Sequence, residues 1–274
     1  MKKIISEVFK YFVLILAVAA VILPILPVLF GSLKSNTEFH ESNVLAPPKA
    51  WEWSNFQKAF IDGQMLLGFG NTILVMGVSI IVSVLIGAMT SYVLHRFRFP
   101  GHGVVKTLFL LAALIPAVTN NIAVFQIISD LNIFNTRWAG IVLFSGTDII
   151  SVYIFLQFMD NISESLDEAA MMDGASYFRI FFTIIAPLLL PAIATVMIIK
   201  GVSIYNDFTT PFLFMPKASL AMISTSLYNF SGPFGARWEI ICAGIIIVSV
   251  PALIVFLALQ KWIYSGLVAG SVKS

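Results

Sequence analysis

The chain alternates between long apolar runs and short polar connections. Six runs carry no charged residue or a single one, and they occupy residues 11–33, 72–94, 107–129, 138–159, 180–199 and 240–260. A helix that crosses the hydrocarbon layer of a bilayer needs about 20 predominantly apolar residues. Backbone groups there must be satisfied within the segment, and runs without strict alternation achieve this as α-helices. The pattern predicts an all-α, polytopic membrane protein with six transmembrane helices.

Composition supports a membrane environment and excludes several classes of function. Hydrophobic residues make up 59% of the chain and charged residues 11%, against about 25% charged in soluble proteins. The net charge of +2 gives no reason to expect a nucleic-acid partner. The single cysteine, Cys242, excludes an intrachain disulfide, and the three scattered histidines predict no metal site. We therefore expect membrane lipid around the chain and no bound metal.

Basic residues in the connections predict the orientation of the chain. Lys and Arg are favoured in cytoplasmic connections, and the short basic loop "HRFRFPGHGVVK" joins the second and third runs. Both termini and the loop between the fourth and fifth runs are then cytoplasmic, in a cell (plasma or inner) membrane. The first run exceeds the roughly 7–15 apolar residues of a signal peptide, so we expect an uncleaved span. The expected divisions are residues 1–34 (N-terminal stub and first helix), 35–71 (outer loop), 72–266 (five-helix core) and 267–274 (cytoplasmic tail).

One cytoplasmic loop concentrates the acidic residues. Its stretch "SESLDEAAMMDGAS" combines good helix formers with acids near the N-terminal end, where the helix dipole favours them. Asn161 with Glu164, and Ser165 with Glu168, have the spacing of capping boxes. Gly174 is suited to end a helix in the left-handed conformation. The pattern predicts a short helix, a glycine turn and a second helix that enters the fifth span.

The residues alone leave two interpretations of this short helix open. It is either an ordinary interfacial hairpin whose acids keep it solvated, or a surface that docks into a groove of another protein. The second interpretation rests on the smooth pair Ala169–Ala170, which stands beside Glu168 at a rigid turn.

Spacing within the loop resembles a known signature. The signature Glu-Ala-Ala-x3-Gly-x9-Ile-x-Leu-Pro marks the membrane subunits of binding-protein-dependent ABC importers. Matching residues stand at Glu168, Ala169, Ala170, Gly174, Ile184 and Pro187. Ala186 departs from the signature, because leucine is usual there, and this is a mild change on an apolar face. The full spacing is far more specific than an isolated Glu-Ala-Ala.

Other segments are similar to the smaller permease subunit of the carbohydrate, or maltose-type, branch of this family. They include "LNIFNTRWAGIVLF", "YNDFTTPFLF" and the C-terminal "GLVAGSVKS". Tyr205 stands where tryptophan is common, which obscures the fine substrate assignment. The resemblance implies the type I ABC importer transmembrane fold. It also implies import of a sugar or oligosaccharide by alternating access.

The resemblance implies partners as well. We expect a cytoplasmic ATPase dimer, a second homologous permease subunit and an extracytoplasmic solute-binding protein. The helix at about 161–175 is expected to couple the ATPase to the spans through Glu168, Ala169, Ala170, Asp173 and Gly174. ATP and Mg²⁺ are expected in the ATPase subunit, because "GHGVVKT" in this chain lacks the contiguous Gly-Lys-Thr of a P-loop. This chain is therefore expected to bind no cofactor and to be no enzyme.

Polar residues in or next to the apolar runs are candidates for a translocation path, since burying them in a membrane is costly. They are Asn120, Asn121, Thr147, Asp148, Asn206 and Asp207. Hydrogen bonds between helices explain such residues equally well. Three alternatives to a sugar importer stay open: a permease for another solute class, a membrane scaffold, and an ion-coupled secondary transporter. The last predicts internal repeats and ion sites near the bilayer midplane.

Overall fold

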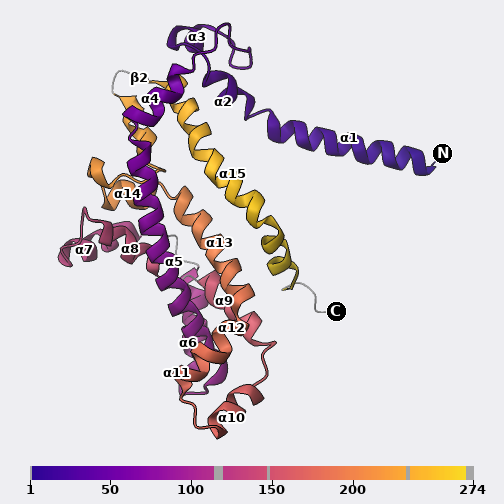
Figure 1. Cartoon of the computed structure of the whole chain (residues 1–274), viewed down its shortest axis with the longest axis vertical. Helices are drawn as coiled ribbons and strands as arrows, with labels where there is room; N and C mark the ends of the chain where they lie inside the picture. The colour runs from indigo at the N-terminus through magenta and orange to yellow at the C-terminus, as the bar shows by residue number, and fades with distance from the viewer. Residues whose placement is uncertain (1, 114–119, 147–148, 233–234, 270–274) are drawn as a thin grey trace. The chain divides into compact units, whose positions relative to one another are not determined.

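The computed structural model describes residues 2–113, 120–146, 149–232 and 235–269 (Figure 1). The chain divides into two compact units. The first comprises Met1–Gly68 and Thr225–Ile254, and the second comprises Phe69–Ser224 and Val255–Ser274. Both units are built mostly from helices, as the apolar pattern predicts.

Helices and one small hairpin make up the first unit. Its elements are α1 (Lys2–Ile22), α2 (Leu26–Gly31), α3 (Asn36–Glu41), α4 (Ser54–Asp62), the 3-10 turn η4 (Ser226–Phe230), strands β1 (Ser231–Gly232) and β2 (Gly235–Ala236), and the start of α15 (Trp238–Ala269). The two strands pair antiparallel, with Ser231 opposite Ala236. The segment predicted as an outer loop, residues 35–71, contains α3, α4 and the first turns of the next helix.

Buried polar groups hold the first unit together. Lys34 is only 1% exposed, and its ammonium donates to Ser42 Oγ and to the Asn43 carbonyl, each at 2.9 Å. The Asn55 side chain donates to the carbonyl oxygens of Ser32 and Lys34, at 3.0 and 2.8 Å. A buried charge is tolerated when it is hydrogen-bonded in this way. These bonds fix the segment between α2 and α4.

The second unit contains most of a 32-residue helix, α5, and the predicted coupling loop. Its elements are α5 (Met65–Arg96, from residue 69 onward), α6 (His102–Ala113), α7 (Asn121–Asp130), α8 (Arg137–Ser145), α9 (Ile149–Met159), α10 (Ser165–Met172), α11 (Tyr177–Ile180), the π-helical turn η2 (Phe181–Ile185), α12 (Ala186–Leu188), α13 (Leu190–Asn206), α14 (Thr209–Phe214) and the 3-10 turn η3 (Ala218–Leu220).

Within the described ranges, three helices are long and apolar enough to cross a membrane: Ser6–Gly31, Met65–Arg96 and Trp238–Ala258. Two bent pairs, Arg137–Ser145 with Ile149–Met159 and Tyr177–Leu188 with Leu190–Asn206, bring the number to five if each pair is one span. These segments coincide with five of the six predicted runs. The remaining run, residues 107–129, falls on α6 and α7 and includes residues 114–119, which lie outside the described residues. A sixth span stays a prediction.

The fifth predicted run is not one straight helix. Its two parts, Tyr177–Leu188 and α13, meet at an angle of 76°. The bend follows the π-helical turn η2 and lies between Pro187 and Pro191. Proline lacks the N–H that continues the helical ladder and clashes with the preceding turn, so two prolines four residues apart break the helix. The span predicted at residues 180–199 instead continues to Asn206.

A line of serines joins α5 to the bent pair α8–α9. Ser79, Ser83 and Ser91 of α5 donate to the carbonyl oxygens of Ile141, Gly146 and Val152, at 3.2, 3.3 and 3.0 Å. Small polar residues allow helices to approach closely and hydrogen-bond across an apolar interface. Interhelical bonding therefore explains the serines of this span.

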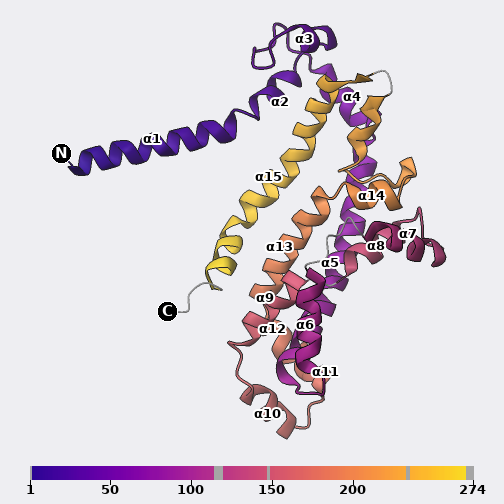
Figure 2. The same ribbon diagram turned by 180° about the vertical axis from the view of Figure 1, so that it is seen from behind.

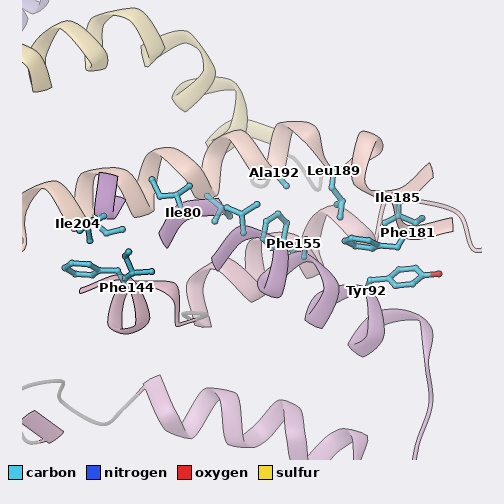
Figure 3. Close-up of a cluster of buried hydrophobic side chains, with 14 of the residues drawn as sticks. Ile80, Tyr92, Phe144, Phe155, Phe181, Ile185, Leu189, Ala192 and Ile204 are labelled. Carbon is cyan, nitrogen blue, oxygen red and sulfur yellow. The ribbon is translucent and has the colours of Figure 1, made fainter. Parts of the chain in front are cut away.

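The apolar core of the second unit runs along α5 and α13 (Figure 3). Phe144 and Ile204 lie at one end of the drawn cluster, and Tyr92, Phe181 and Ile185 lie at the other. The ring of Tyr92 packs at this end, while its hydroxyl points away from the cluster. That hydroxyl bonds to α10, so the core ends where the predicted coupling helix begins.

Candidate functional site

Helix α10 lies at one end of the second unit in both views of the chain (Figure 1, Figure 2). It coincides with the acidic stretch that predicts a short helix. Neither predicted capping box forms, because Glu164 occupies the N-cap with helical backbone angles and no side-chain bond. The hydroxyl of Ser163 instead accepts from the Ser165 amide at 3.3 Å, and Asn161 bonds back into α9. The capping-box predictions are therefore wrong.

The C-terminal end of α10 closes as the sequence predicts. Gly174 has a φ of +79°, in the left-handed region, and follows the exposed C-cap residue Asp173. The Gly174 amide bonds to the Met171 carbonyl at 2.9 Å, and the Ala175 amide to the Ala170 carbonyl at 3.0 Å. These two bonds form the Schellman arrangement, which glycine adopts without steric cost. The predicted glycine turn is confirmed.

The two faces of α10 have different surroundings. Asp167 and Ala170, three positions apart and so on one face, are 5% and 9% exposed. Glu168, Ala169 and Met172 lie on the opposite face and are exposed, Met172 by 88%. The predicted contact pair Ala169–Ala170 is therefore divided, with Ala170 packed in the chain's own core. Met172 joins Glu168 and Ala169 on the outward face.

An ion pair attaches the inward face of α10 to α5. Arg96, the last residue of α5, donates from Nε to Asp167 Oδ2 at 3.0 Å. Tyr92 donates from its hydroxyl to the other carboxylate oxygen, Oδ1, at 2.8 Å. The side chains of Arg96 and Asp167 are 6% and 8% exposed. Charge-assisted bonds are the stronger class of hydrogen bond, and burial protects this pair from screening by salt.

Aromatic rings join the same end of α5 to the segment after the glycine turn. Phe97 and Tyr177 have ring centroids 4.9 Å apart, and Tyr92 and Phe181 have centroids 5.6 Å apart. Tyr177 begins α11, and Phe181 follows it in the π-helical turn. Both α10 and the helix that follows it are therefore fastened to the end of α5.

Sequence reasoning missed Tyr92, Arg96 and Met172, and it assigned Asp167 only to the acidic start of the helix. One signal was available in the sequence. Asp167 and Ala170 are three positions apart and share a helix face, so an inward position for Ala170 also places Asp167 inward, where it needs a partner. The bond from Arg96 to Asp167 spans 71 residues, so no local pattern indicates it.

Two of the predicted path residues stand at the start of α7, and two others lie outside the described residues. Asn120 is exposed and Asn121 is half-buried at the start of α7. Thr147 and Asp148 lie outside the described residues, between α8 and α9. Their place on a path stays a prediction.

The other two predicted path residues have partners close in sequence. Asn206, the last residue of α13, donates from Nδ2 to the Val202 carbonyl at 2.9 Å. The carboxylate of Asp207 accepts from the Thr210 amide at 2.8 Å and from the Thr210 hydroxyl at 3.1 Å. Asp207 thereby fixes the start of α14, and its place on a translocation path stays a prediction.

A lysine stands at the break between α8 and α9. Lys200 of α13 is half-buried, and its Nζ donates to the carbonyl of Gly146, the residue after α8, at 2.8 Å. Ser83 of α5 donates to the same carbonyl oxygen. Three apolar segments thus meet at a polar junction that sequence reasoning did not predict.

In the part of the chain that the structure describes, no group of three or more His, Cys, Asp or Glu residues is placed to hold a metal ion. The segment "GHGVVKT" forms the start of α6, from His102 onward, and follows the helix α5 and a turn. A P-loop follows a strand, so the local structure here does not suit phosphate binding.

Residues 83–268 match the family described as "Binding-protein-dependent transport system inner membrane component". The match covers more than half of the 274-residue chain and includes α10 together with Tyr92 and Arg96. The chain belongs to this family. As an inner membrane component of a transport system, it is a permease and not an enzyme.

Relatives of this inner membrane component match it over nearly their whole length. A probable ABC transporter permease protein of Bacillus subtilis, YurM, is 29% identical over 98% of this chain and 89% of its own. The arabinooligosaccharides transport system permease protein AraQ of Halalkalibacterium halodurans is 27% identical, covering 92% and 91%. The melibiose/raffinose/stachyose import permease protein MelC of Bacillus subtilis is 28% identical, also covering 92% and 91%.

The fold is also that of a solved transporter. A chain from a bacterial ABC transporter involved in the import of the acidic polysaccharide alginate aligns with a TM-score of 0.81. The alignment covers 95% of this chain and 97% of the other, at 20% sequence identity. The inner membrane component therefore has an ABC transporter permease fold.

Proposed function

We propose that this permease is the smaller membrane subunit of an ATP-driven importer that carries a sugar or oligosaccharide into the cytoplasm by alternating access. The names of the relatives AraQ and MelC support this solute class, as does the resemblance of several segments to the carbohydrate branch. A competition panel of oligosaccharides against the cognate binding protein identifies the solute. Uptake of a solute from another class would contradict this part of the proposal.

The proposed architecture is the type I importer fold with six transmembrane helices and both termini in the cytoplasm. The proposed divisions are residues 1–34, 35–71, 72–266 and 267–274. The six apolar runs and the basic loop between the second and third support them. Accessibility of single cysteines to a membrane-impermeant reagent tests the side of each connection.

The observation that carries the proposal is the outward face of α10. Met172 is 88% exposed at the end of the eight-residue helix α10, on the same face as Glu168 and Ala169. Exposed apolar side chains beside a charged residue suit a protein interface. The proposed partner is the cytoplasmic ATPase dimer, which would offer an apolar groove for Met172 and a basic side chain for Glu168. Asp173 and Gly174 would set the turn, and Ala170 would support the helix from behind.

Two further partners belong to this proposal: a second homologous permease subunit and an extracytoplasmic solute-binding protein. The family description, which names binding-protein-dependent transport, supports the solute-binding protein. The resemblance of several segments to the smaller permease subunit supports a second permease. ATP and Mg²⁺ would bind to the ATPase subunit. In the membrane, Asn120, Asn121, Thr147, Asp148, Asn206 and Asp207 would provide hydrogen-bonding groups along the path.

Co-purification tests the proposed function. The full-length chain, extracted in mild detergent, is expected to bring with it an ATPase that carries a P-loop and a second permease. Glu168→Lys is expected to release the ATPase while the permease pair stays together. Glu164→Gln is the matched control, because Glu164 is an exposed acid one turn earlier whose carboxylate lies 3.9 Å from Arg96 of α5. A lone homo-oligomer from wild-type protein would favour a secondary transporter or a scaffold instead.

A further inference from the structure

Arg96 holds the loop before α10 as well as α10 itself. Besides Asp167, its guanidinium donates from Nη2 to the carbonyl oxygens of Ile162 and Ser163, at 2.8 and 3.4 Å. Its Nη1 lies 3.1 Å from Nδ1 of His95. A single buried side chain at the end of α5 therefore holds the loop before α10 at several points.

Asp167 is bonded to α5 through both oxygens. Tyr92 and Arg96 are four residues apart, so they project from one face of α5 towards the same carboxylate. Two bonds that converge from one rigid helix fix the direction of the carboxylate as well as its distance. A buried ion pair is favourable only when its remaining hydrogen-bonding groups are satisfied, and this arrangement meets that condition.

α10 needs such an attachment because it is only eight residues long. Isolated helices shorter than about 12–15 residues are marginal in water, so packing must supply most of the stability of α10. Its inward face carries Asp167 and Ala170, and its outward face carries Glu168, Ala169 and Met172. Attachment and docking therefore use different residues of the same helix.

We propose that Tyr92, Arg96 and Asp167, here called the Arg96 clamp, make α10 and the end of α5 move as one body. They are positioning residues: they do not touch the ATPase, and they pass its motion into α5. The transmission of ATPase motion rests on the proposed function, whereas the attachment of α10 to α5 does not. If the clamp is lost, the outward side chains of α10 are unchanged, but the orientation of α10 relative to α5 is no longer fixed.

Hydrogen exchange of the purified full-length chain in nanodiscs tests the link without a partner. In Asp167→Asn, amides of Ser165–Met172 are expected to exchange at least about tenfold faster, while amides in the middle of α5 stay protected. Tyr92→Phe, which keeps the ion pair and the ring, is expected to give a smaller increase. The matched control is Glu164→Gln, which removes a charge 3.9 Å from Arg96 on an exposed side chain. Exchange in Asp167→Asn equal to that in the control would overturn the clamp.

The assembled importer tests the transmission of motion. Adding ATP is expected to change amide exchange within α5 in wild-type protein and in Glu164→Gln. Asp167→Asn is expected to retain the ATPase subunit and to lose this response in α5. That result would show that Asp167 positions α10 and does not bind the ATPase. Loss of the ATPase subunit from Asp167→Asn, or a response like that of wild type, would overturn the inference. Absence of any ATPase from the wild-type preparation would instead contradict the proposed function, and the exchange experiment on the chain alone would still decide the clamp.

Discussion

The hydroxyl of Tyr92 donates a 2.8 Å hydrogen bond to the carboxylate of Asp167, across 75 residues of sequence. Asp167 is one position before Glu168, which faces the other way. A residue of the transmembrane core thus touches the helix that the importer family is expected to use for contact with its ATPase. The core and the proposed docking surface lie on opposite faces of this one short helix.

Removing the Tyr92 hydroxyl should destabilise the isolated permease. Tyr92→Phe keeps the ring in its place beside Phe181 but leaves one buried oxygen of Asp167 without its donor. The expected loss is about 1–3 kcal/mol of unfolding free energy, measured by denaturation in detergent. Tyr177→Phe is the control, because that ring is 51% exposed, and it should change stability much less. Equal effects of the two substitutions would contradict the role given to the hydroxyl.

Substitutions of Gly174 should rank by how well each residue accepts a left-handed backbone. A Cβ at Gly174 meets nothing within 4 Å, so the cost is conformational and not steric. Asn adopts this conformation more readily than other residues, and β-branched Val resists it. Gly174→Asn should therefore retain uptake of the cognate oligosaccharide, whereas Gly174→Val should abolish it with the membrane insertion unchanged. Normal uptake by Gly174→Val would mean that the turn does not matter for coupling.

Truncating Met172 should weaken the ATPase contact without weakening the permease fold. Burial of a Met side chain stabilises an interface by about 1.5–3 kcal/mol, so Met172→Ala should lower the affinity for the ATPase subunit by about 10- to 150-fold. The thermal stability of the isolated chain should not change, because Met172 is 88% exposed. Leu166→Ala, on a half-exposed residue off the outward face, serves as control. Unchanged affinity in Met172→Ala would remove this residue from the interface.

Alanine substitutions at two glycines should change the stability of the chain in opposite directions. A Cβ at Gly140 would lie 2.7 Å from Met215 Sδ and 3.2 Å from Val75 Cγ1, so Gly140→Ala should destabilise the chain by about 1–3 kcal/mol. A Cβ at Gly77 in α5 meets nothing within 4 Å, and Gly77→Ala should stabilise that helix by up to about 1 kcal/mol. Denaturation of the isolated chain measures both, and a stable Gly140→Ala would show that the contact between α8 and Met215 is loose.

Sequence patterns predicted the features that depend on neighbouring residues. The apolar runs mark the helices, and Gly174 ends α10 because left-handed backbone favours glycine at that position. The capping boxes failed although their spacing is right, since Glu164 already has helical angles. The inward position of Asp167 depends on Arg96 and Tyr92, which are far away in sequence. Pro187 and Pro191 mark where the fifth run breaks, but prolines are tolerated in many membrane helices, so the sequence alone did not predict a bend as sharp as 76°.

A photo-crosslinking residue at position 172 tests most directly whether α10 contacts the ATPase. The probe replaces Met172 in the full-length permease within its native membrane, and a second variant carries it at Ile61 of α4, which is 59% exposed in the segment predicted to lie outside. We expect an adduct from position 172 with a protein whose peptides contain a P-loop, and none from position 61. An ATPase adduct from position 61, or none from position 172 in membranes that contain the assembled importer, would contradict the account.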